Sequence, residues 1–430
     1  MKLGFSVIAL SFAVHGFAQG LTEDEAISIG IQNSFGVKAA ASQLRQAKER
    51  TNQALGMLGF RLDGQATYER YEPSRLMGSG SGQSDSKTAS LAFNYPIDLV
   101  GLRGKAIRGA RSNESAAERG IDVEENNTKE SIRRAYFNVL RAEWQVQVQT
   151  GAHEAAEARL KNAQTLYTQG AIARFDVLRY ETEVSRAQSS LESANNQVLL
   201  AKQVLNQAMS RDVATPIELA SPYADVRTDN LPRYTLNEGA LLQQALENRP
   251  ELTQLEALLK AREFFTVTER GGLLPSLNLQ ALYLHTFDAG AFSRENAVTF
   301  GITLSFPIWD SGITRARVAV AKEDEVQTRL AADRTRLSVS LEVQSALVQV
   351  RNSLSQLNFV RKTVELQSEA LRLAELRYSA GEGILLDVTT ADSDLRTALG
   401  ALASARSDYL TAIASLKRAI GSDNLPPANP

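Results

Sequence analysis

Side chains that could carry out covalent or acid–base chemistry are few in this sequence, and their spacing does not suit it. The 430 residues include no cysteine, which excludes disulfides, thiolate metal sites and a cysteine nucleophile. A Ser-x-x-Lys pattern at Ser84–Lys87 lies in a Gly/Ser-rich stretch without the partner motifs of the enzymes that use it. Residues 101–105 contain glycines and a lysine but lack the spacing of a phosphate-binding loop. We therefore predict that the protein is not an enzyme.

The remaining candidates for metal, cofactor or nucleic-acid binding are equally sparse. His15, His153 and His285 lie far apart in the sequence and are not accompanied by a ligand cluster. The net charge is −2, which creates no overall field that would attract nucleic acid. We expect no bound metal, no cofactor and no nucleic-acid partner.

The N-terminus has the pattern of a secretory signal peptide. A positive charge at Lys2 precedes an apolar run from Leu3 to Val14, and the small residues Gly16 and Ala18 follow at the −3 and −1 positions of a cleavage site. No later segment has 18 consecutive apolar residues, so we expect no membrane-spanning helix. If the mature chain crosses a membrane, closed β-barrels are the only other option.

Proline spacing indicates long helices in two halves of the chain. No proline occurs between Pro96 and Pro216, or between Pro307 and Pro426. Both windows are rich in good helix formers such as Ala, Leu, Gln, Glu, Arg and Lys. Two such windows of nearly equal length suggest an internal duplication.

Matching residues at a constant offset support that duplication. Leu21-Thr22-Glu23 aligns with Leu236-Asn237-Glu238, and Asp176-Val177 aligns with Asp387-Val388. We predict a signal peptide at 1–18, a first repeat at 19–210 and a connector at 211–235, followed by a second repeat at 236–421 and a tail at 422–430. Each repeat should contain a helix, a β-hairpin and a long α-hairpin.

Period-two alternation predicts the strands. Every second residue from Val298 to Phe306 is apolar, and Ala89–Tyr95 alternates in the same way. Strands of roughly 9–11 residues would suit a tilted crossing of a bilayer. The Gly/Ser-rich stretch Ser74–Lys87 is predicted to be a flexible, exposed loop between two of them.

A heptad pattern predicts the packing of the long helices. Each helix before the turn should have about 60 residues and a length of about 90 Å. Leu366 and Leu373 start a second, weaker stripe, which indicates neighbours on two sides, as in a ring of helices. The apolar positions of the last helix recur at spacings of four and three, with alanine in one of the two seam positions of each heptad from 391 onward: Ile384, Val388, Ala391, Leu395, Ala398, Leu402, Ala405, Tyr409, Ala412, Leu416 and Ala419.

Four strands per chain imply self-association if they lie in a membrane. Four strands cannot close on themselves, and an open sheet edge is not tolerated in lipid. Two copies would give eight strands with a filled interior, and three copies would give twelve with space for a pore. The residues alone do not choose between these two assemblies.

An ordered set of motifs resembles one family. Phe306–Gly312 reads Phe-Pro-Ile-Trp-Asp-Ser-Gly after a strand, and Tyr378–Gly381 is followed by Leu386–Val388. With the duplication and the order of elements over about 400 residues, the chain resembles the TolC-like outer-membrane efflux proteins. The resemblance implies a mainly α fold with a β-barrel part. Duplicated α-hairpins would form a periplasmic α-barrel, and four strands per chain would contribute to a twelve-stranded transmembrane β-barrel in a homotrimer.

The resemblance also implies functional residues. Asp387, Asp392 and Asp394 become candidates for a periplasmic gate, although Thr390 stands where the family often has a second acid. An Asp in the first turn of a helix is equally explained by the helix dipole. Five residues at the hairpin tips become candidates for adaptor contact, although turn geometry alone accounts for the glycines: Gly170, Ala171, Gly381, Glu382 and Gly383.

The implied function is an outer-membrane channel of a tripartite system with a periplasmic extension. Outer-membrane lipid would surround it, and a periplasmic adaptor (a membrane fusion protein) would link it to an inner-membrane pump. The expected cargo is small toxic molecules, and the alternative is type I polypeptide secretion. A periplasmic structural coiled-coil protein is the hypothesis from a different class.

A basic cluster follows one of the predicted strands and consists of Arg103, Lys105, Arg108 and Arg111. It would be a ring at the membrane–periplasm junction or a solvated helix face.

Overall fold

The computed structural model describes residues 20–77, 81–223, 225–226, 230–287 and 294–426. The predicted signal peptide at 1–18 lies outside the described residues, as do the last four residues of the predicted tail. The side chains of residues 71–84 are likewise outside the description, although most of their backbone is within it.

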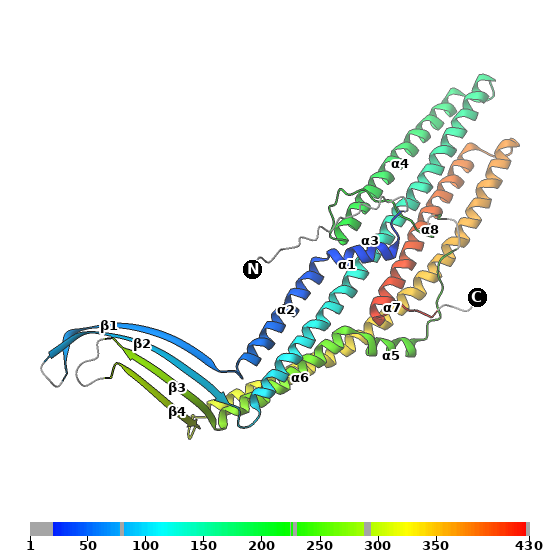
Figure 1. Cartoon of the computed structure of the whole chain (residues 1–430). Helices are drawn as coiled ribbons and strands as arrows, with labels where there is room; N and C mark the ends of the chain where they lie inside the picture. Colours follow the sequence, from blue (N-terminus) through cyan, green and yellow to red (C-terminus); the bar gives the residue numbers. More distant parts are fainter. Residues whose placement is uncertain (1–19, 78–80, 224, 227–229, 288–293, 427–430) are drawn as a thin grey trace, which may run out of the picture. The chain divides into compact units, whose positions relative to one another are not determined.

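The two halves of the chain contain the same helices and strands in the same order, apart from one short 3₁₀ helix in the second half (Figure 1). The first half consists of α1 (Glu23–Asn33), α2 (Phe35–Gly56), β1 (Arg61–Met77), β2 (Ser81–Ile97), α3 (Leu102–Thr168) and α4 (Arg174–Ala208). The second half consists of α5 (Glu238–Asn248), α6 (Pro250–Arg270), the short 3₁₀ helix η1 (Gly271–Leu273), β3 (Ser276–Thr286), β4 (Asn296–Ser305), α7 (Ile313–Ser379) and α8 (Leu385–Ile420).

Polar caps start the first helix of each half at equivalent positions. Thr22 Oγ1 accepts a hydrogen bond from the Glu25 backbone N–H at 3.3 Å, and the Glu25 carboxylate accepts one from the Thr22 N–H at 3.0 Å. This reciprocal arrangement is a capping box. In the second half, Asn237 Oδ1 accepts from the Ala240 N–H at 3.3 Å. The aligned Leu-Thr-Glu and Leu-Asn-Glu triplets therefore start equivalent helices.

The chain folds into two compact units, and each unit contains parts of both halves. Unit 1 comprises the residues up to Lys38, Glu124–Asn248 and those from Val339 onward. Unit 2 comprises Ala39–Val123 and Arg249–Ser338. The units thus cut across the predicted repeats, whose boundaries remain a prediction.

In unit 2, the strands form one antiparallel sheet in the order β1-β2-β3-β4. The register places most of the apolar positions of the four strands on one face, which we call the apolar sheet face, and leaves Leu282 and Leu284 of β3 on the other. Across the sheet, Gly64 pairs with Leu91, Leu91 with Tyr283, and Tyr283 with Val298. Asp63, Gln280 and Thr299 lie on the opposite, polar face. The contribution of β4 to the apolar sheet face consists of Val298, Phe300, Ile302 and Leu304, which are 57–81% exposed in the single chain.

The loop predicted at Ser74–Lys87 is wrong. β1 continues to Met77 and β2 starts at Ser81, and the backbone pairs Arg75 with Gln83 and Met77 with Ser81. The two strands have 17 residues each, longer than the predicted 9–11, whereas β3 has 11 and β4 has 10. Pairing within a hairpin satisfies the backbone even where Gly and Ser are weak strand formers, so local composition was a poor guide here.

In unit 1, the helices α3, α4, α7 and α8 lie side by side (Figure 1). From Ala398 onward the predicted heptad seam of α8 lies in their core, and Leu402, Tyr409 and Leu416 are at most 5% exposed. In the first half, the seam alanines Ala187, Ala194 and Ala201 are also buried and allow close approach of the helix axes. Leu366 and Leu373, the predicted second stripe, are 59% and 47% exposed in the single chain. Among the described residues, no helix is long and apolar enough to cross a membrane.

The described residues of the connector 211–235 pack on the helices of unit 1. Its Leu219 forms a parallel bridge with Leu21. Trp144 donates its indole N–H to the Tyr223 carbonyl at 2.9 Å, and Tyr409 donates its hydroxyl to the Pro232 carbonyl at 2.7 Å. These contacts attach the connector to α3 and α8, and so tie the two halves of the sequence together.

The C-terminal segment is held by an ion pair that predicts a pH dependence. Arg133 Nη1 lies 2.7 Å from Asp423 Oδ1, and Arg133 is buried. Burial raises the pKa of the Asp423 carboxyl, but the hydrogen bond and charge of Arg133, together with the charges of Lys129 and Lys417, lower it by more, so the net shift is downward. A carboxylate with a depressed pKa contributes stability above its unfolded pKa of about 3.9, and that stability is lost as the pH falls through the folded value.

We expect Asp423→Asn to lower the melting temperature of the detergent-solubilised protein at pH 7. The difference between wild type and variant should shrink as the pH falls through the acidic range in which Asp423 becomes protonated. Thermal unfolding followed by circular dichroism at both ends of that range measures it. A difference that stayed constant down to low pH would contradict the assignment to Asp423.

Candidate functional site at the ends of the two helical hairpins

The two hairpin tips have the same backbone geometry. Gly170 and Gly381 adopt φ values of +74° and +76°. Each glycine N–H bonds three residues back, to Tyr167 and Tyr378 respectively, and the following N–H bonds five residues back, from Ala171 to Leu166 and from Glu382 to Arg377. This is the Schellman arrangement that ends a helix with a left-handed residue. Glycine is required there because a side chain disfavours positive φ.

Around these tips, several large apolar side chains are exposed in the single chain. In the first hairpin they include Phe175 at 67% and Leu178 at 47%. In the second they include Ile384 at 61% and Leu386 at 55%. Apolar side chains that gather at exposed positions mark an interaction surface more often than an ordinary solvated one.

The three predicted gate acids lie in different environments on α8. Asp387, in the first turn, and Asp394 are exposed, whereas Asp392 is only 4% exposed. The structure therefore does not gather the three carboxylates into one cluster within the single chain. Their assignment as a gate remains a prediction.

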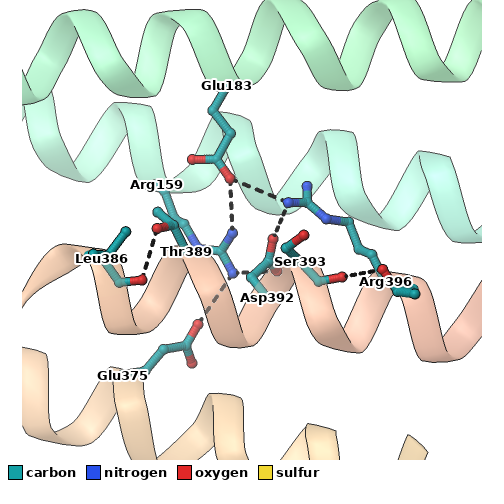
Figure 2. A network of polar contacts seen from close by, with 9 residues as sticks. Arg159, Glu183, Glu375, Leu386, Thr389, Asp392, Ser393 and Arg396 are labelled. Carbon is teal, nitrogen blue, oxygen red and sulfur yellow. Dashed lines mark hydrogen bonds and ion pairs between the residues drawn. The ribbon is translucent and has the colours of Figure 1, made fainter.

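Asp392 lies at the centre of an ion-pair network that connects four helices (Figure 2). Its Oδ1 accepts from Arg159 Nη2 on α3 at 2.8 Å, and its Oδ2 lies 2.8 Å from Arg396 Nη2, one turn further along α8. Glu183 on α4 approaches both arginines, at 3.9 Å from Arg159 and 3.6 Å from Arg396. Glu375 on α7 lies 3.5 Å from Arg159. We call these five residues the four-helix network.

Burial makes the contacts of the four-helix network stronger than those of a surface ion pair. The side chains of Asp392 and Arg159 are 6% and 15% exposed. Burial lowers the pKa of the Arg159 guanidinium, but the hydrogen bond to Asp392 and the charges of Asp392, Glu183 and Glu375 together raise it more, so the net shift is upward. Arginine is thus charged at any accessible pH, and removing its carboxylate partner would leave a buried charge uncompensated.

A polar groove of about 880 Å³ runs beside this network. Its walls come from α4 and α8, and residues of α3 contribute Gln145 and Gln149. Hydroxyl and charged groups dominate the lining near the network: Tyr180, Arg186, Thr389, Ser393 and Thr397. Such a surface can solvate polar solutes, but it does not pair a nucleophile with an activating base.

The sequence offered only a partial signal for the four-helix network. Asp392 and Arg396 stand four residues apart on a predicted helix, a spacing that favours an ion pair. Arg159, Glu183 and Glu375 come from three other helices, and their convergence depends on how the hairpins pack. Among the described residues, no group of three or more His, Cys, Asp or Glu could hold a metal ion.

The sequence model of the outer membrane efflux protein family matches residues 26–211 and 241–422, which together include most of both halves. The chain belongs to the outer membrane efflux protein family.

Individual relatives of this efflux protein match over most of its length. The cobalt-zinc-cadmium resistance protein CzcC of Cupriavidus metallidurans is 24% identical over 379 residues, which cover 87% of this chain and 84% of CzcC. The pyoverdine export outer membrane protein OpmQ of Pseudomonas aeruginosa is 25% identical over 412 residues, which cover 93% of this chain and 84% of OpmQ.

Solved structures of outer membrane channels share the fold of this efflux protein. The CmeC outer membrane channel of Campylobacter jejuni superposes with a TM-score of 0.78 at 18% identity, covering 93% of this chain and 85% of CmeC. The open state of the MtrE outer membrane channel of Neisseria gonorrhoeae gives a TM-score of 0.75 at 20% identity, covering 93% and 89%. The predicted family and fold class are therefore confirmed.

The family match places this efflux protein in the bacterial outer membrane with a periplasmic extension, as the sequence predicted. It also identifies the protein as an outer membrane efflux channel. The members it resembles are channels, which favours a non-enzymatic role.

Proposed function

We propose that this protein is the subunit of a homotrimeric, passive exit duct for small toxic molecules. An inner-membrane pump would drive the flow through a periplasmic adaptor. The observation that carries the proposal is the family match across both halves of the chain. The names of two relatives, cobalt-zinc-cadmium resistance and pyoverdine export, give small solutes rather than polypeptides as cargo, which favours efflux over protein secretion.

The open edges of the sheet support the proposal of a homotrimer. β1 and β4 each have only one hydrogen-bonded neighbour within the described residues. Unpaired backbone groups at an edge are costly in lipid, so each edge needs a strand from another copy. Three copies would contribute twelve strands, which is enough to leave a pore between them.

The exposed apolar side chains at the hairpin tips support the proposal of adaptor contact. The tip residues Gly170, Ala171, Gly381 and Glu382 are exposed, and Gly383 is half-buried. Beside them Ile384 and Leu386 present apolar surface that a helical partner could cover.

We further propose that the predicted gate acids act in two ways. Asp387 and Asp394 are exposed and are free to face the pore axis in a trimer. Asp392 is buried and would act indirectly, by fixing the packing of the hairpins through the four-helix network.

A deletion strain tests the proposed function. We expect the strain to become hypersensitive to some members of a panel of dyes, antibiotics, detergents and metal salts, and the intact gene to restore tolerance. The secreted proteins of the two strains are compared in parallel. Unchanged tolerance together with a missing secreted protein would overturn small-molecule efflux in favour of polypeptide export.

A further inference from the structure

The turn that joins β4 to α7 carries the most exposed large apolar side chains recorded for the described residues. Ile308 is 87% exposed and Trp309 is 86% exposed. The equivalent turn between β2 and α3 carries Leu99 and Val100, which are 49% and 51% exposed. Exposing apolar groups of this size to water is unfavourable, which marks the β4–α7 turn as a surface that something covers.

The β4–α7 turn is firmly held by its own hydrogen bonds. Asp310 accepts from the Gly312 N–H at 3.0 Å and from the Thr314 N–H at 2.8 Å. Gly312 adopts a φ of +83°, which closes the turn before the helix starts. The exposure of Ile308 and Trp309 therefore belongs to a defined backbone conformation. At the start of α7, the N–H groups of Ile313, Thr314 and Ala316 are already used in bonds to Asp310 and Gly312.

The apolar turn follows directly in sequence on the last strand of the apolar sheet face. Along β4 and beyond its end, alternate residues remain apolar and more than half exposed: Phe300 at 81%, Ile302 at 72%, Leu304 at 57%, Phe306 at 58% and Ile308 at 87%. The apolar sheet face is the lipid-facing surface expected of an outer-membrane protein of this family. The lipid that covers these strands is therefore the nearest candidate to cover the turn as well.

Positive charge lies directly beside this turn. The first ten residues of α7 contain Arg315, Arg317 and Lys322 and no acid. Cations at the start of a helix are disfavoured by the helix dipole, so helix stability does not account for them. Arg315 and Arg317 are exposed, and no ion pair of theirs is recorded within the described part of the chain. A negatively charged partner outside the chain would explain them.

We propose that residues 307–312, together with Arg315 and Arg317, form a lipid anchor at the membrane–periplasm junction. Ile308 and Trp309 would insert into the periplasmic leaflet of the outer membrane, and the two guanidinium groups would bind the phosphate of anionic phospholipids. Tryptophan prefers this depth because its ring is apolar and its N–H is polar. The planar guanidinium matches phosphate oxygens in pairs. The proposal rests on the outer-membrane location and holds whichever cargo the channel exports.

The chain offers a built-in probe of the first part of this proposal. It has two tryptophans, and the other one, Trp144, is fully buried. Subtracting the fluorescence of Trp309→Phe from that of the wild type isolates the emission of Trp309. The wild type and Trp309→Phe, each as the complete exported chain, are reconstituted into phospholipid vesicles. The phospholipids carry bromine near the headgroup end of their acyl chains. We expect these lipids to remove about half of the Trp309 emission, because the indole ring would lie at headgroup level.

The second part requires a headgroup comparison. In mixed phosphatidylglycerol and phosphatidylcholine vesicles, either the anionic or the zwitterionic lipid is brominated, at equal mole fraction and low salt. We expect the anionic lipid to quench Trp309 preferentially, with about a fivefold gain in relative affinity per arginine. Arg315→Gln/Arg317→Gln should remove that preference and retain quenching by total lipid. Arg334→Gln/Arg351→Gln is the matched control, since it removes two exposed arginines further along the same helix.

Each outcome decides one part of the proposal. Trp309 emission that no brominated lipid reduces, in protein with a wild-type circular dichroism spectrum and oligomer mass, would overturn insertion and indicate that another copy covers the turn. An anionic preference that survives Arg315→Gln/Arg317→Gln would overturn the assignment of the phosphate contact. Loss of the preference upon addition of free phosphate at constant ionic strength would indicate a site for the free ion rather than for lipid.

Discussion

Phe300→Arg will prevent the protein from accumulating in the outer membrane. Phe300 lies in the middle of β4 and is 81% exposed on the apolar sheet face. An arginine near the middle of a lipid-facing strand costs about 2–4 kcal/mol, and a homotrimer would carry three of them. We expect the variant to lose most of its trimer from the outer-membrane fraction, as measured by immunoblotting of membranes separated by density.

The neighbouring residue provides a matched control. Thr299 pairs with Leu282 and lies on the opposite, polar face of the sheet. Thr299→Arg introduces the same charge one residue away, but it would project away from lipid, so the trimer should assemble at close to the wild-type level. Equal loss of both variants would show that β4 tolerates no arginine on either face, and the assignment of the lipid-facing side would then fail. Wild-type assembly of Phe300→Arg would contradict it directly.

The strand faces could be predicted from the sequence because they depend on a local pattern. Alternation from Val298 to Phe306 assigns each residue to a face before any partner strand is known. The antiparallel register then places Tyr283 beside Val298 and Leu91, and so extends one apolar face across the sheet. The extent of the first hairpin could not be predicted in this way. Its Gly- and Ser-rich end has weak strand propensity, and cross-strand pairing decided its structure.

The helical core could be predicted equally well, because a heptad pattern of apolar residues identifies the side of a helix that is buried against its neighbours. Leu416 and Tyr409 follow the pattern and are almost fully buried. The four-helix network was not predictable, because equivalent positions of the two repeats behave differently. At the offset of 211, Glu183 aligns with Asp394 and Glu181 aligns with Asp392. Glu183 joins the network while Asp394 is exposed, and Asp392 joins it while Glu181 is exposed. A duplicated sequence therefore gives an asymmetric set of contacts.

Asp392→Asn will destabilise the hairpin ends strongly. Asp392 is 4% exposed and contacts the guanidinium groups of Arg159 and Arg396, both at 2.8 Å. Asparagine retains the size of the side chain but removes the charge, so two partly buried cations lose their closest partner. Breaking a buried ion pair by removing one member costs about 3–5 kcal/mol. We expect a clearly lower melting temperature and faster amide hydrogen exchange in α3 and α8 near residues 159 and 392.

Asp394→Asn is the matched control for this prediction, because it makes the same change two residues away at an exposed position. A surface change of this kind is usually worth less than about 0.5 kcal/mol. A double-mutant cycle of Asp392→Asn with Arg159→Met then separates the pair from its surroundings. If the two residues act through each other, the double variant will be less destabilised than the sum of the single variants. If the losses in free energy of unfolding are additive, Asp392 acts through Arg396 and Glu183 and not through Arg159. The contact between α3 and α8 would then have to be assigned to the alanine-rich seam alone.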